Sequence, residues 1–145
     1  MDGVAAEQNS DTGASIASAY KTYVEHGDFN GNGGSGLVVV SGGEVKLNEL
    51  DAVANSAAGA SITTGSNVFV NPSYFTWNGA NGLDIAAGGG VLLSEVTASN
   101  NFGMGANISA AGGITVNGGQ FSNNAGDGLN LVSGGDIVIK CVTAL

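Results

Sequence analysis

The sequence predicts an all-β fold, a parallel β-solenoid of about six stacked 23-residue turns. Three observations predict it. Glycine and asparagine each recur with a strict 23-residue period and no insertion, apolar residues alternate with other residues in short runs, and Gly-rich corners separate these runs. A unit of this length has no room for a helix and cannot bury its own apolar face, so each turn must stack on copies of itself.

Two unbroken columns of residues define the repeat. If each turn is numbered from its glycine as position 1, an asparagine always occupies position 20. The glycines are Gly13, Gly36, Gly59, Gly82, Gly105 and Gly128, and the asparagines are Asn9, Asn32, Asn55, Asn78, Asn101 and Asn124. We therefore expect a single domain over 1–145, with full turns at 13–35, 36–58, 59–81, 82–104 and 105–127 and partial turns at 1–12 and 128–145.

Each turn is expected to contain three short strands. Positions 2 and 4 hold apolar pairs such as Leu37 and Val39, positions 10 and 12 hold pairs such as Val45 and Leu47, and a third strand covers positions 15 to 17. Right-handed coiling is expected, because parallel crossover connections almost always take that hand. The asparagine side chains of successive turns are expected to hydrogen-bond to one another as a structural ladder.

A second period, of two turns, appears at the core positions. Position 17 alternates between Phe and Ala, while position 2 alternates between Ala and Leu in the opposite sense, so that large and small side chains compensate within each turn. The large members of this alternating core are Phe29, Phe75, Phe121, Leu37, Leu83 and Leu129. The full repeat is therefore a 46-residue unit of two turns.

Three runs carry a resemblance to a known family. They are Gly-Leu-Asp-Ile at 82–85, Gly-Gly-Gly-Val at 88–91 and Val-Thr-Ala-Ser-Asn-Asn at 96–101. They resemble turns of right-handed parallel β-helix repeats, which occur in pectin-lyase-like enzymes and in bacterial surface proteins of the filamentous-haemagglutinin type. The resemblance implies an extracellular or cell-surface location, and it implies architecture more than activity, because this fold hosts lyases, hydrolases, adhesins and passive fibres.

Charge and composition limit the partners. The chain has 12 acidic residues against 3 lysines and no arginine, a net charge of −9, which excludes nucleic acid as a partner because affinity for phosphates depends on basic residues. No apolar run approaches the roughly 20 residues that span a bilayer, so membrane insertion is not expected. The first residues lack the basic and apolar regions of a signal peptide, and none is expected in this chain.

The titratable residues do not form an obvious catalytic constellation. The polysaccharide lyases that the sequence resembles use clustered acids to hold calcium and an Arg or Lys as base, whereas this chain has no arginine and its lysines are scattered. Asp28 and Asp51, one turn apart, are the closest acidic pair, and the only histidine, His26, is five turns from the only cysteine, Cys141. We therefore expect no enzyme, no catalytic residues, no cofactor and no metal site.

Two functions remain. The first is a structural protein whose solenoid ends, without evident caps, associate head to tail into an extracellular fibre, sheath or adhesin stalk, with the chain itself as partner. The alternative is a carbohydrate-binding or polysaccharide-degrading β-helix. Tyr74 and Trp77 are the candidate sugar contacts, and Phe69 and Leu92 form a small apolar patch suited to lateral packing.

Overall fold

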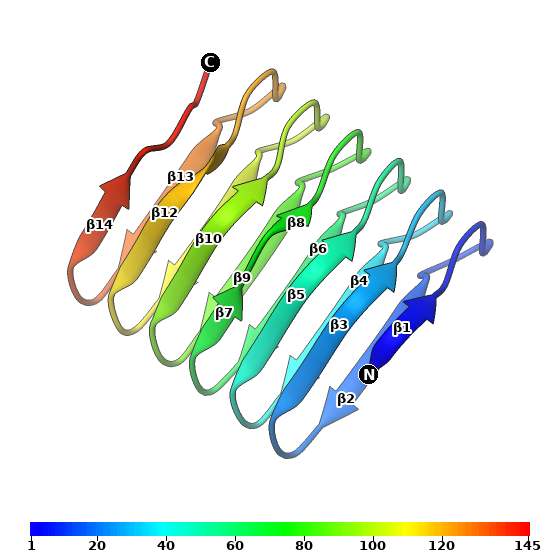
Figure 1. Ribbon diagram of the computed structural model, residues 1–145, viewed down its shortest axis with the longest axis horizontal. Helices are drawn as coiled ribbons and strands as arrows, with labels where there is room; N and C mark the ends of the chain where they lie inside the picture. Colours follow the sequence, from blue (N-terminus) through cyan, green and yellow to red (C-terminus); the bar gives the residue numbers. More distant parts are fainter.

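The computed structural model describes residues 1–145 and shows a rod made of two parallel β-sheets, with the turns stacked in sequence order from one end to the other (Figure 1). The larger sheet has eight strands in the order β1-β3-β5-β7-β10-β12-β14, with β8 paired to β5 and β10. These strands are β1 (Asp2–Ala5), β3 (Thr22–Asp28), β5 (Val45–Asp51), β7 (Val68–Val70), β8 (Ser73–Tyr74), β10 (Val91–Thr97), β12 (Ile114–Gln120) and β14 (Ile137–Lys140).

The smaller sheet forms the other wall of the rod. Its six strands are β2 (Ala14–Ser18), β4 (Leu37–Ser41), β6 (Ala60–Thr64), β9 (Leu83–Ala87), β11 (Ala106–Ala110) and β13 (Leu129–Ser133), paired in that order. Residues 23 apart face each other in every pairing, as Leu37 faces Ala60. The structure thus confirms the all-β parallel solenoid of about six 23-residue turns, and it contains no helix that could cross a membrane.

The strands of the larger sheet bend at position 14. His26, Glu49 and Glu95 have φ values of 49°, 53° and 53° there, so the expected second and third strands of these turns run on as one bent strand. Pro72 occupies the same position in the intervening turn. Its ring holds φ at about −65°. Proline therefore cannot adopt the left-handed conformation, and the strand is divided there into β7 and β8.

The core lies between the two sheets and follows the expected two-turn alternation. Phe29, Phe75 and Phe121 are fully buried, as are Leu37 and Leu83, and the last member, Leu129, is partly buried. A Cβ atom on Gly27 would lie 2.6 Å from Cε2 of Phe29, which is why a turn with Phe at position 17 has a small residue at position 15.

The asparagine column forms a ladder along the rod. Each side-chain NH2 group donates to the side-chain oxygen one turn further on, over 2.9 Å from Asn9 to Asn32, 3.0 Å from Asn32 to Asn55, 3.1 Å from Asn55 to Asn78 and from Asn78 to Asn101, and 3.0 Å from Asn101 to Asn124. The same oxygen also accepts the backbone N–H of the preceding asparagine, as Asn101 does from Asn78 at 3.0 Å. The ladder therefore joins side chains and backbone of all its turns.

Candidate functional site

The corner beside the ladder has an unusual backbone. The residue that precedes each ladder asparagine, at position 19, has a positive φ in every turn. These residues are Gln8, Gly31, Ala54, Trp77, Asn100 and Asn123. Asparagine and glycine adopt this conformation at low cost, whereas a bulky Trp rarely does. Trp77, with φ of 60°, therefore occupies a position that its backbone preference disfavours.

The ladder itself supplies a rigid floor. Asn101 donates from Nδ2 to the oxygen of Asn124 at 3.0 Å and to the backbone oxygen of Phe75 at 3.0 Å, so its amide is held from two sides. Asn124 in turn donates to the backbone oxygen of Ala98 at 3.0 Å. Because these amides are engaged within the protein, they shape the surface above them and do not swing outward.

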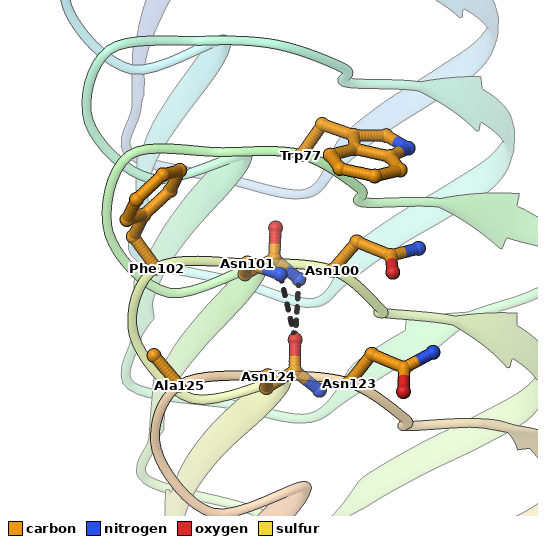
Figure 2. A pocket seen from close by; sticks show the side chains of 7 residues that line it. All are labelled: Trp77, Asn100, Asn101, Phe102, Asn123, Asn124 and Ala125. Atoms are coloured by element: carbon orange, nitrogen blue, oxygen red, sulfur yellow. Dashed lines mark hydrogen bonds between the residues drawn. The ribbon is translucent and has the colours of Figure 1, made fainter.

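Seven residues form a trough over this floor, with a volume of about 390 Å³. They are Trp77, Asn100, Asn101, Phe102, Asn123, Asn124 and Ala125. Figure 2 shows one wall made by Trp77, Asn100 and Asn123 in successive turns, an opposite wall made by Phe102 and Ala125, and Asn101 and Asn124 between them. We call this feature the Trp77 trough.

The walls of the Trp77 trough combine two kinds of surface. Trp77 and Phe102 are 62% and 77% exposed, which is high for aromatic residues of this size and leaves much of their surface open to a ligand. The amides of Asn100 and Asn123 continue the wall of Trp77, without a hydrogen-bond partner among the residues of the trough, and an amide can both donate and accept. Such a surface suits a ligand that has an apolar ring face and a rim of hydroxyl groups.

The structure distributes the four side chains that the sequence singled out over three depressions. Tyr74 is 55% exposed but lines a different depression, of about 530 Å³, together with Glu95 and Gln120. Phe69 and Leu92 face each other on β7 and β10 and line a third. Only Trp77 belongs to the trough.

Sequence reasoning missed the partners of Trp77. Phe102 stands in a column that otherwise holds Ser10, Gly33, Ser56, Gly79 and Ala125, so its size was the available signal. Asn100 and Asn123 were hidden because asparagine is common throughout this chain. Only the stacking of successive turns places them one above the other along a single wall of the trough (Figure 2).

The acidic pair lies on the larger sheet. Asp28 and Asp51 are register partners on β3 and β5, and Asp51 is in turn in register with Tyr74 on β8. Partial burial, followed by the charge of Asp28, raises the pKa of Asp51 above its ordinary value. The structure thus brings together two carboxyl groups and a phenol in one outward row.

His26 is held between acids on the same sheet. Its Nδ1 lies 2.8 Å from Oδ1 of Asp2 and its Nε2 lies 3.1 Å from Oε2 of Glu49. The hydrogen bond to Asp2, followed by the charge of Glu49, raises the pKa of His26. Cys141 is exposed at the far end of the same column, and no group of three or more His, Cys, Asp or Glu side chains converges as metal ligands would.

The stack of parallel turns, in register from one end of the rod to the other, defines a β-helix protein. The chain matches the family described as "Right handed beta helix region" over residues 41–143 and belongs to that family. The predicted family and its right-handed coiling are thereby confirmed. No curated protein matches the chain.

A solved structure shares the fold. It is described as "Crystal Structure of the periplasmic alginate epimerase AlgG T265N T268M double mutant" and has a TM-score of 0.66 and 16% sequence identity to this chain. The match covers 93% of this chain but only 36% of the other, so the chain spans about a third of the length of that protein.

This match corrects one prediction from the sequence. The sequence predicts no enzyme, because its titratable residues form no obvious catalytic constellation, yet the same β-helix architecture is found in an epimerase. The physical reason is that in-register parallel strands place outward side chains of one column about 4.8 Å apart, so a row such as Asp28, Asp51 and Tyr74 can form on the sheet itself without loops. A regular stack therefore does not exclude catalysis.

Proposed function

We propose that this chain is a carbohydrate-binding β-helix domain that holds a polysaccharide in the Trp77 trough. One observation carries the proposal: the rings of Trp77 and Phe102 flank a floor and wall of asparagine amides in an open trough on a rigid ladder. Aromatic rings offer apolar faces to sugar C–H groups, and the amides of Asn100 and Asn123 offer donors and acceptors to hydroxyl groups.

The relationship to known proteins supports a polysaccharide ligand. The structural neighbour is described as an alginate epimerase, an enzyme named for a polysaccharide, and as periplasmic. As part of the proposal, we infer that this chain also acts on or binds a polysaccharide and that it lies outside the cytoplasm. Location at the cell surface stays a prediction from the sequence.

Trp77 is the only tryptophan, so its fluorescence reports directly on the trough. We expect polysaccharide binding to shift its emission to shorter wavelength, because a sugar ring over an indole that is 62% exposed displaces water. The Trp77→Asn variant, whose new residue matches Asn100 and Asn123 in the same column, should lose binding in affinity electrophoresis. Tyr20→Ser removes another aromatic ring, 82% exposed, outside the trough, and should bind normally.

Cleavage of a glycosidic bond at Asp28 and Asp51 is a second candidate. Asp51, with its raised pKa, suits the general acid, and Asp28 suits the carboxylate that stabilises or attacks the sugar carbon. Release of reducing ends from a polysaccharide panel, abolished by both Asp28→Asn and Asp51→Asn, supports this activity. Unchanged release in both variants contradicts it.

Self-association remains a prediction from the sequence. Phe69 and Leu92, the two residues predicted to pack laterally, are half-buried and in register on β7 and β10, and Nζ of Lys46 lies 5.5 Å from the ring centre of Phe69. Sedimentation velocity over a range of concentrations tests it. A monomer at all concentrations contradicts both head-to-tail and lateral association.

A further inference from the structure

The lining of the Trp77 trough carries no charge. All seven residues are aromatic, aliphatic or amide side chains. A ligand with carboxylate or sulfate groups would leave these anions without a cationic partner in the trough, whereas hydroxyl groups find donors and acceptors in Asn100 and Asn123.

The same side of the rod becomes acidic toward the N-terminus. A second depression, of about 420 Å³, is lined by Glu7 and Asp51. Its wall also contains Gln8, Gly31 and Ala54, which precede Trp77 in the column of positive φ residues. Because that column continues from one depression to the other, a polymer that extends from the trough along the rod axis in this direction meets two carboxylates.

The cations lie elsewhere. Lys21 and Lys46 both lie 3.8 Å from Oε1 of Glu44, and Lys140 belongs to β14. None of the three lysines lines either depression, and the chain has no arginine. With a net charge of −9, the protein also repels polyanions at long range, especially at low salt.

From this charge distribution we infer that the ligand of the Trp77 trough is a neutral polysaccharide and not a polyuronate. The inference rests on the proposed function and names its ligand class. It also sets this chain apart from the alginate epimerase whose fold it shares, since alginate is a polymer of uronic acids. Neutral recognition requires no ion pair, so binding should be insensitive to salt.

The test compares three soluble polymers by affinity electrophoresis and by fluorescence of Trp77. Hydroxyethylcellulose and mixed-linkage β-glucan are neutral, and alginate is anionic. We expect a neutral polymer to bind at least about tenfold more tightly than alginate, with an affinity that stays constant between low and high sodium chloride. Trp77→Asn should weaken this binding by about tenfold or more, and Tyr20→Ser should leave it unchanged.

A charge variant makes the test two-sided. Ala125→Lys places a cation on the wall opposite Asn123, and we expect it to create salt-sensitive binding of alginate. If wild-type protein binds alginate as tightly as the neutral polymers, with dependence on Trp77, the inference is overturned while the proposed function stands. If no polymer binds, the proposed function fails as well.

Discussion

Gly36 lies so close to Asn55 that a Cβ atom on the glycine would stand 2.7 Å from Nδ2 of the asparagine, and equally close to the backbone oxygens of Gly59 and Phe29. The same close approach recurs along the rod. A Cβ atom on Gly13 would stand 2.6 Å from Nδ2 of Asn32, and one on Gly59 would stand 2.7 Å from Nδ2 of Asn78. The glycine and asparagine columns are therefore one packing constraint, in which the ladder amide occupies the space that any side chain at position 1 would need.

The first prediction concerns this contact. Gly36→Ala should lower the free energy of unfolding by about 2–3 kcal/mol, because two of the three obstructing atoms belong to the backbone and cannot move aside. Urea denaturation measures the change. Gly65→Ala is the matched control, because its nearest neighbour would lie 3.8 Å away, and it should be neutral or slightly stabilising. An equal loss of unfolding free energy in both variants would show that crowding by the ladder amide and its neighbouring backbone is not the reason for glycine at position 1.

The second prediction concerns the ladder. Asn78 is fully buried, and it accepts from the backbone N–H and the Nδ2 of Asn55 and donates to Asn101 and to the backbone oxygen of Ala52. Asn78→Ala leaves these buried groups without partners and should destabilise the protein by about 3 kcal/mol. Asn9→Ala, at an exposed end of the ladder, should lose far less in the same urea titration. A small effect at Asn78 would contradict a structural role of the ladder.

The third prediction concerns the alternating core. Gly27→Ala should destabilise by roughly 1–3 kcal/mol, because the new methyl group collides with the ring of Phe29. Phe29→Ala alone leaves a cavity and should cost about 3–5 kcal/mol. The double variant should lose less than the sum of the two, since the smaller side chain relieves the collision. Additive losses in this double-mutant cycle would mean that the two positions are independent.

The fourth prediction concerns pH and the acidic row. Because the folded pKa of Asp51 is raised above the ordinary 3.8, folding favours its protonated form. The free energy of unfolding should therefore fall as pH rises from below 3.8 through the folded pKa of Asp51, and then level off.

Asp51→Asn removes this dependence. Relative to wild type, the free energy of unfolding of this variant should be higher by roughly 0.2–1 kcal/mol at pH 7. Near pH 3 it should be unchanged, because the protonated Asp51 of the wild type is then uncharged, as asparagine is. Asp28→Asn should show a smaller gain, since the neighbouring charge is only the second cause of the shift. Thermal unfolding at a series of pH values measures both. A gain at pH 3 equal to that at pH 7 would refute an electrostatic origin.

The fifth prediction separates binding from folding at Trp77. The Trp77→Asn change should leave the melting temperature unchanged or raise stability by up to about 1 kcal/mol, because asparagine tolerates the positive φ of this corner. Loss of stability greater than about 1 kcal/mol would instead assign the ring to packing.

The strict 23-residue period was enough to predict the architecture. Unbroken glycine and asparagine columns allow no other stacking than in register, and the alternation of Phe29 with Ala52 already indicated a shared corner of the core. The bend at His26 and Glu49 was not predictable in the same way, because residues of any type occupy that column and only the chain path reveals their left-handed backbone.

The candidate site was only partly predictable. Trp77 stood out by its type, yet whether it packs or faces solvent depends on the backbone of its corner, which only the tertiary structure shows. Stacking then decides which residues meet. As a result, Tyr74 lines a different depression, and Phe102, from the next turn, lies on the wall of the trough opposite Trp77. The sequence by itself determined the repeat and the core, because burial of apolar faces follows periodicity. The tertiary structure decided the site, because surface side chains carry no period and are joined only by the turns that lie beside them.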